Sequence, residues 1–200
     1  MADRIACRTR DFVSNKASIM KLPVRIAVLS VACLLAGCGQ NLGTYAVESV
    51  HIATSPPVRA KTAAYYGEFL EIRLRSETNL TALADAVDSV YVHADFCPLS
   101  NPRGLIAFGP YSGNGDDLGL LSASPVLQPG TDDAFHYRVY VPVAHREVRP
   151  ETSGQVRLPT YDLRETKDDL CLRLFSPGYN ITDSRSKTIR VPAKMIPALE

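Results

Sequence analysis

A strict alternation of apolar and polar residues in short segments is the feature that most limits how this chain can fold. In residues 65–76, YYGEFLEIRLRS, the apolar Leu70, Ile72 and Leu74 alternate with charged residues. Successive side chains of a β-strand point to opposite faces of its sheet, so this period of two predicts a strand with one buried face. Several such segments in one chain favour a fold made of sheets.

The same period recurs between residues that favour turns. Besides 65–76, strands are predicted over residues 45–52, 89–97, 105–111, 118–121, 135–143, 170–174 and 187–192. Asn114 and Gly115 predict a tight hairpin turn, after which residues 118–121 pair back on the preceding strand. Pro142 either weakens the end of its strand or places that strand at an edge, because proline has no N–H for the sheet.

One short amphipathic helix is expected among these strands. From Leu80 to Val87, apolar residues recur at offsets of three, four and seven after the capping-type residues Thr78 and Asn79. A parallel α/β sheet needs repeated helical crossovers, which a single helix cannot supply. The strands therefore predict an antiparallel β-sandwich.

The last two predicted strands resemble a known arrangement. Residues 170–174 and 187–192 are similar to the closing hairpin of an immunoglobulin- or fibronectin-like sandwich, although the chain has no Trp for the Cys–Trp–Cys pattern of true immunoglobulin domains. The fold expected is mainly β: an immunoglobulin- or fibronectin-like antiparallel sandwich over residues 65–200, with one short helix.

The apolar run at residues 26–38, IAVLSVACLLAGC, predicts export. Basic residues precede it and small residues end it, and it is shorter than the ~20 residues of a membrane-spanning helix. Its end, Leu35-Ala36-Gly37-Cys38, resembles the lipobox of bacterial lipoproteins. The resemblance implies a diacylglycerol on the Cys38 thiol, cleavage before Cys38 and acylation of the new amino terminus.

The resemblance also divides the chain. Residues 1–37 are expected to be a leader and signal peptide, for which Met20 is an alternative start that puts basic residues at its front. Residues 38–64, rich in small polar residues and proline, are expected to tether the lipid to the domain. The residue after Cys38 is Gly39 rather than Asp, which resembles the pattern of lipoproteins sorted to the outer membrane. This resemblance implies an envelope protein that faces the periplasm.

Charge argues against a nucleic-acid partner. Of 22 Lys and Arg and 21 Asp and Glu residues, six basic and two acidic ones precede Cys38, which leaves 16 and 19 and a net charge of −3. A mildly acidic chain with interspersed charges has no basic stripe for a phosphate backbone. The membrane, reached through the lipid, and an envelope protein are the partners expected.

The cysteines predict one disulfide. Cys7 and Cys33 lie in the leader and Cys38 is the lipidation residue, so Cys97 and Cys171 are the pair left in an oxidising compartment. Both fall on the polar side of their predicted strands, one at the end of its strand and one early in its own. A bridge near one end of the sandwich is therefore predicted.

Chemical motifs are few. His93 and Asp95 are two apart on a predicted strand and share a face, which suits a metal or an acid–base pair, although solvent-facing strands commonly show such rows. His136 with Arg138 and Tyr140 could bind a small anion. Acidic residues at 113–117 and 132–133 could offer oxygens to Ca²⁺ but fit turns as well.

Two functions remain open at this stage. No G-x-S-x-G, phosphate-binding glycine loop or close Cys/His zinc spacing occurs, so no catalytic residue, metal ligand or cofactor is predicted. The favoured function is a lipid-anchored, non-enzymatic binding or assembly module of the cell envelope. The alternative is a small envelope hydrolase or metal-binding enzyme that uses His93, Asp95 and His136.

Overall fold

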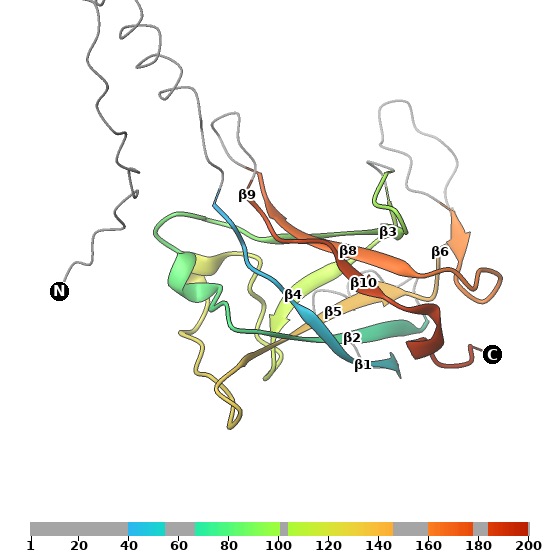
Figure 1. Cartoon of the computed structure of the whole chain (residues 1–200), viewed down its shortest axis with the longest axis horizontal. Coiled ribbons are helices and arrows are strands. Elements are labelled where there is room, and N and C mark those ends of the chain that lie inside the picture. Colours follow the sequence, from blue (N-terminus) through green and yellow to red (C-terminus); the bar gives the residue numbers. More distant parts are fainter. Residues whose placement is uncertain (1–39, 55–66, 101–103, 146–159, 178–183, 200) are drawn as a thin grey trace, which may run out of the picture. The chain divides into compact units, whose positions relative to one another are not determined.

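The structure, a computed structural model, is an antiparallel β-sandwich (Figure 1). It describes residues 40–54, 67–100, 104–145, 160–177 and 184–199. The leader, the lipobox with Cys38, residues 55–64 of the expected tether and residues 146–159 of the long loop lie outside the described residues. Residues 38–200 belong to one compact unit.

Two sheets make up the sandwich. The first has the order β1-β2-β5-β4 and the second the order β10-β8-β3, with β9 also paired to β8. The strands of the first sheet are β1 (Ala46–Ala53), β2 (Phe69–Ser76), β5 (Phe135–Pro142) and β4 (Phe108–Ser112). Those of the second are β10 (Ile189–Val191), β8 (Leu170–Ser176), β3 (Tyr91–Phe96) and β9 (Ser184–Arg185), and a short pair joins β6 (Ala144–His145) to β7 (Tyr161–Asp162).

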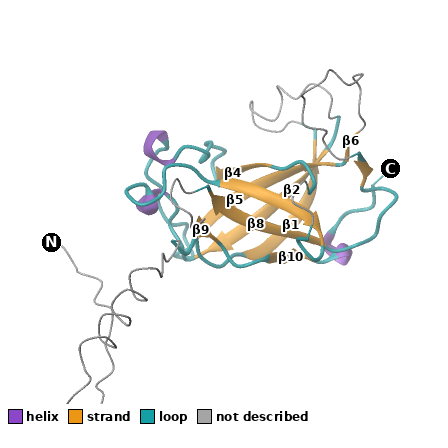
Figure 2. Cartoon of the chain, turned by 90° about the horizontal axis from the view of Figure 1, so that it is seen from above, coloured by secondary structure: helices purple, strands orange, loops and turns teal. Residues whose placement is uncertain are grey.

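The strand order is that of a seven-strand immunoglobulin sandwich. Taken as A to G along the chain, β1, β2, β3, β4, β5, β8 and β10 give the sheets ABED and CFG. The predicted closing hairpin is present as the antiparallel pair of β8 and β10. Figure 1 shows the two sheets as separate layers, and Figure 2 shows loops gathered at both ends of the strands.

The core lies between the sheets and follows the predicted alternation. Leu70, Ile72 and Leu74 of β2 are fully buried, and Tyr137, Val139 and Val141 of β5 face the same core. The second sheet contributes Ala94, Leu170, Leu172, Leu174, Ile189 and Val191. The polar residues between them therefore point outward from each sheet.

The expected short amphipathic helix is one turn of 3-10 helix, η1 (Thr81–Leu83), rather than a helix that runs from Leu80 to Val87. Leu80 and Val87 are buried as the pattern predicts. The Tyr137 hydroxyl accepts from the Leu80 amide at 3.1 Å and donates to the Thr78 carbonyl at 2.6 Å. Burial raises the pKa of Tyr137 to about 12. These contacts with a distant strand hold the segment as one short turn, although its apolar spacing is that of a longer helix.

Two other predicted elements differ. Residues 118–121 form no strand: Leu120 makes an isolated bridge to Ser89 and Leu121 begins a 3-10 turn, η2 (Leu121–Ala123). Leu118 and Leu121, three apart, both enter the core. Leu120 between them is 52% exposed. β5 is a central strand, so Pro142 ends it rather than marking an edge.

The domain begins earlier than residue 65. β1 pairs with β2 along its length, although its sequence falls within the expected tether of residues 38–64. Leu42 is fully buried, and its carbonyl accepts a hydrogen bond from the Tyr45 hydroxyl at 2.7 Å. The first strand of the sandwich therefore follows closely after the lipidation residue proposed from the sequence.

Candidate functional site

Cys97 and Cys171 lie at disulfide distance, as predicted, with Cα atoms 5.1 Å apart. Asp95 of β3 is opposite Cys171 of β8, and the Cys97 amide bonds the Asp169 carbonyl just beyond the paired ladder. The bridge therefore joins neighbouring strands of one sheet at one end. It lies on the outward face, because Ala94 between the polar residues enters the core.

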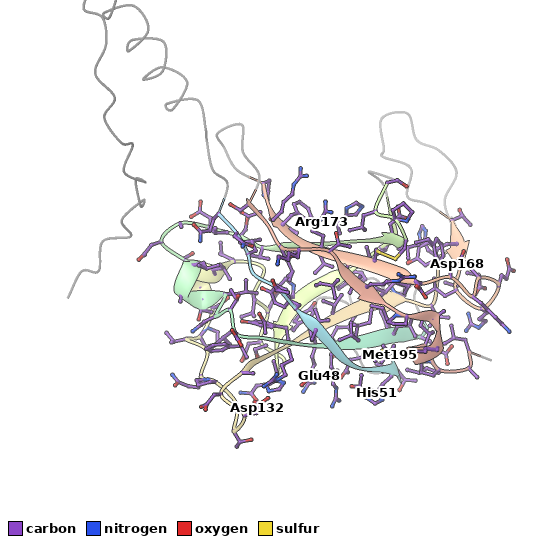
Figure 3. All side chains as sticks on the ribbon, in the orientation of Figure 1. Glu48, His51, Asp132, Asp168, Arg173 and Met195 are labelled. Atoms are coloured by element: carbon purple, nitrogen blue, oxygen red, sulfur yellow. A yellow bond between two sulfur atoms is a disulfide. The ribbon has the colours of Figure 1, made fainter. Side chains whose placement is uncertain are left out.

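The structure separates the three residues of the enzyme hypothesis. His93 and Asp95 point outward from the β10-β8-β3 sheet, whereas His136 points outward from the β1-β2-β5-β4 sheet. Figure 3 shows this separation, since Arg173, opposite His93 in register, lies on the far side of the sandwich from Glu48 and Asp132. The core between the sheets keeps these residues from forming one site.

His136 instead belongs to an ionic cluster with Glu48, Asp132 and Arg75. Its Nδ1 lies 3.0 Å from the Glu48 carboxylate and its Nε2 lies 3.0 Å from Oδ1 of Asp132. Arg75 donates from Nε to Oδ2 of Asp132 at 2.7 Å. The cluster spans β1, β2, β5 and the turn before β5, so it ties three strands and a loop together.

Local backbone geometry makes this cluster possible. A β-bulge between Val47 and Ser49 interrupts the register of β1 at Glu48. Gly130 lies against the ion pair, and a Cβ there would come within 2.9 Å of both Asp132 Oδ1 and His136 Nε2. A side chain at position 130 would therefore displace the Asp132 carboxylate or the imidazole from this contact.

The charges in the cluster support one another. Hydrogen bonds to Asp132 and Glu48 raise the pKa of His136, which favours the imidazolium with both ring nitrogens donating. The same histidine, together with Arg75, holds the pKa of Asp132 well below its usual value. Asp132 in turn raises the pKa of Arg75. The outcome is a histidine held between two carboxylates.

A second group surrounds Glu71 on the same face. The Glu71 carboxylate, with a side chain 12% exposed, accepts from Arg73 Nε at 2.7 Å and from the Tyr140 hydroxyl at 3.0 Å, and Arg138 Nε lies 4.0 Å away. Burial acts to raise the pKa of Glu71, but these bonds and charges outweigh it and the pKa is lowered. The predicted anion-binding residues Arg138 and Tyr140 thus already contact a carboxylate of the protein.

We call the outward side of the β1-β2-β5-β4 sheet the charged face, defined by Glu48, Glu71, Arg73, Arg75, Asp132, His136, Arg138 and Tyr140. An aromatic cluster continues it toward the Phe69 end of β2. Phe69, Tyr111 and Tyr140 are buried there, with Tyr111 and Tyr140 packed edge to face at 5.6 Å. The aromatic cluster gives the charged face a rigid support.

A cavity of about 330 Å³ opens beside His136. Gly113 and Asp116 of the first acidic loop line it, and so does Gly130, two residues before the second acidic loop at 132–133. Asp116 accepts from the Ser112 hydroxyl at 2.9 Å within its own turn, and Asp132 is bonded to Arg75 and His136. Val126 lines the cavity and is 77% exposed, so it offers an apolar surface for contact.

Metal binding is one chemistry that the cluster could support. Glu48, Asp132 and His136 each offer a ligand atom, and these atoms lie within 4.8 Å of one another. The two carboxylates contact opposite ring nitrogens, however, and Arg75 occupies one oxygen of Asp132. A cation would have to displace these ion pairs, so the geometry favours an ionic network over a metal centre.

Sequence reasoning found His136, Arg138 and Tyr140 but missed their carboxylate partners. Glu48 lay in the expected tether, and Asp132 was assigned to a turn. The alternation on β2 had already placed Glu71, Arg73 and Arg75 on one outward face. Pairing that strand with residues 135–143 would have brought the two polar rows together.

Comparisons with protein-family models, curated proteins and solved structures find no match to this chain. Among the residues that the structure describes, no helix has the length and apolar character needed to cross a membrane.

Proposed function

We propose that this protein is a lipid-anchored, non-enzymatic domain of the cell envelope that binds a protein partner through the charged face. The observation that carries the proposal is the ordering of exposed arginines by ion pairs beside a cavity. Arg73 and Arg75 have side chains 48% and 47% exposed, yet each is held by a carboxylate at 2.7 Å. Such side chains lose less conformational freedom when a partner binds.

The composition of the charged face suits a protein partner. Arginine and tyrosine are enriched at protein interfaces, and a polar rim around an apolar anchor is their common arrangement. Arg73 and Arg138, with side chains 48% and 31% exposed, supply the polar contacts, and Val126 at the cavity supplies the apolar anchor. Carboxylates of the face compensate its cations, so a partner with mixed charges fits better than a polyanion.

The anchor rests on the sequence. The run that ends in Leu35-Ala36-Gly37-Cys38 supports lipidation at Cys38 and attachment to the outer membrane on its periplasmic side. Short spacing between Cys38 and β1 would hold the domain near the bilayer. Metabolic labelling with a fatty acid tests this part. Wild type should take up label and Cys38→Ser should not, while wild type cleaved elsewhere and unlabelled would overturn the anchor.

Partner binding is tested by site-specific photo-crosslinking in cells. A crosslinking residue at Arg73 or at Val126 should capture the same envelope protein. Lys187, an exposed residue in the loop before β10, is the matched control position. Capture of one protein from both test positions and not from Lys187 supports the proposal. Equal capture from all three positions would contradict it.

The enzyme alternative keeps one supporting observation, the proximity of Glu48, Asp132 and His136. Calorimetric titration of the purified protein with Zn²⁺ and with Ca²⁺ separates the two functions. The ionic network predicts no stoichiometric binding that depends on His136. Tight binding lost in His136→Gln would favour the metal site and count against a purely ionic role.

A further inference from the structure

A groove at one end of the sandwich lies between two segments that the charged face does not use. One wall is the segment after β7, from Leu163 to Lys167, and the other is the C-terminal segment from Ala193 to Leu199. The cavity between them measures about 520 Å³. Figure 2 shows the loop after β7 and the C-terminal turn at the same end of the sandwich.

Both walls are fixed to the sandwich. The Leu163 amide donates to the Val143 carbonyl at 2.8 Å, and Leu163 itself is buried. On the other side, the Asp169 carboxylate accepts from the Ala193 amide at 2.7 Å and from Arg190 Nε at 2.5 Å. These bonds secure the start of the turn η3 (Ala193–Met195).

The far part of the C-terminal wall is held by apolar packing. Met195, Ile196 and Leu199 pack against the main core. Each wall is thus anchored to the sandwich by its own contacts. The groove is therefore a formed feature of the fold, which small-molecule sites usually are.

The lining combines apolar side chains with cations. Leu163, Ile196, Pro197 and Leu199 supply apolar surface, and none of the lining residues that the structure describes carries a carboxylate. Three cations do belong to it: Arg164, Lys167 and Lys194.

These three cations differ in their partners. Arg164 is neutralised by Glu68 at 2.6 Å and by Asp162 at 3.4 Å. Lys167 and Lys194 are exposed, and neither has an ion pair within the part of the chain that the structure describes. Among the described residues, therefore, no carboxylate compensates these two positive charges, which lie one on each wall of the groove.

We propose that this groove binds a single-chain anionic amphiphile, with its apolar chain along the groove and its carboxylate between Lys167 and Lys194. The volume falls within the range of about 300–1,000 Å³ usual for small-molecule sites. An apolar lining favours an alkyl chain, and two lysines that have no carboxylate partner among the described residues favour an anionic head. A neutral lipid would leave the lysines uncompensated, and a free anion would leave the apolar walls uncovered.

The test measures binding of alkanoates to the full chain with Cys38→Ser, which lacks the lipidation thiol. Octanoate, decanoate and dodecanoate are titrated calorimetrically below their micelle concentrations, with decanol and inorganic phosphate as the other arms. Because each buried CH₂ contributes about equally, affinity should rise about fourfold per added CH₂. Decanol should bind at least tenfold more weakly than decanoate, and phosphate should show no saturable binding.

Variants assign the binding to the groove. The double substitution Lys167→Gln and Lys194→Gln should remove the preference for decanoate over decanol while keeping the dependence on chain length. Ile196→Gln should weaken decanoate and decanol alike, with the fold checked by its melting temperature. Lys187→Gln, a matched loss of one surface charge outside the groove, should leave both affinities unchanged.

Three results would overturn the site. Absence of decanoate binding, affinity independent of chain length, or decanoate binding unchanged by the double lysine substitution would each do so. The partner-binding proposal does not depend on any of these results, because the groove shares no residue with the charged face.

Discussion

The outer face of the β10-β8-β3 sheet carries a covalent bridge, whereas the charged face of the other sheet is held by ion pairs. Cys97 and Cys171 link neighbouring strands directly. On the charged face, partly exposed side chains form the links, such as the 2.7 Å contact of Arg75 with Asp132. A covalent link is indifferent to pH and salt, while exposed ion pairs are sensitive to both and add little stability.

The two faces therefore have different roles. The bridged face stabilises the fold, and the charged face orders surface side chains without adding much to the free energy of folding. Ordered, partly exposed arginines are suited to contact with a partner.

Removal of the bridge should have the largest effect on stability. The two cysteines are 74 residues apart, for which the chain-entropy model gives about 4 kcal/mol. Cys97→Ala combined with Cys171→Ala should therefore lower the free energy of unfolding by about that amount, measured by urea denaturation.

Thiol titration supplies the control for the bridge. The unfolded, unreduced mature protein should show no thiol at Cys97 or Cys171, and two should appear after reduction. A loss in the free energy of unfolding below about 1 kcal/mol, or two free thiols before reduction, would contradict the claim that the disulfide of the bridged face stabilises the fold.

Glu71 is the exception within the charged face, because its carboxylate is buried and the others are exposed. Glu71→Gln should lower the free energy of unfolding by about 2 kcal/mol, since Arg73 and Arg138 would lose their shared partner beside a buried aromatic cluster. Glu165→Gln, at an exposed position, serves as the control in the same denaturation experiment. An equal effect for both variants would show that Glu71 acts like any surface charge.

His136 should give a smaller effect that depends on pH. Its pKa is raised in the folded state, so its stabilisation is full below the unfolded value of about 6.5 and is lost as pH rises through the folded value. Melting temperature should thus contain a component that falls with pH above about 6.5. His136→Gln should remove that component.

A matched histidine controls the pH experiment. His51, also on the first sheet, contacts the Ser49 hydroxyl at 2.9 Å rather than a carboxylate. His51→Gln should keep the fall in melting temperature that His136→Gln removes. If both variants keep this fall in melting temperature, the ion pairs of His136 with Glu48 and Asp132 do not stabilise the fold.

Alternation in the sequence predicted the fold well where one face of a strand meets the core. β2, β5 and β8 each bury the apolar residues that a period of two selects, and the closing hairpin follows from the same pattern. The cysteine pair was predicted because two cysteines remained, and the alternation added that both lie on the polar side of their strands. The 3-10 turn at Thr81–Leu83 was not predictable in this way, because the Tyr137 hydroxyl determines it from a distant strand.

The candidate site was predictable only in part. Polar faces of single strands can be read from the sequence, but their partners depend on which strands are neighbours. A bulge in β1 lets the Glu48 side chain reach across β2 to His136, and the turn before β5 brings Asp132 to the same histidine. Neither contact follows from sequence spacing. The groove lined by Lys167 and Lys194 likewise depends on where residues 193–199 pack against the sandwich.

The central claim, that the charged face binds an envelope partner, is tested most directly by reversing one charge on each outer face. Arg73 of β2 and Arg173 of β8 are the matched positions, and in each variant the arginine becomes Glu. The measurement is the amount of the crosslinked partner that co-purifies with the lipidated protein from membranes. The account predicts at least a tenfold loss for Arg73→Glu and no loss for Arg173→Glu. Equal recovery with both variants, or loss only with Arg173→Glu, would contradict it.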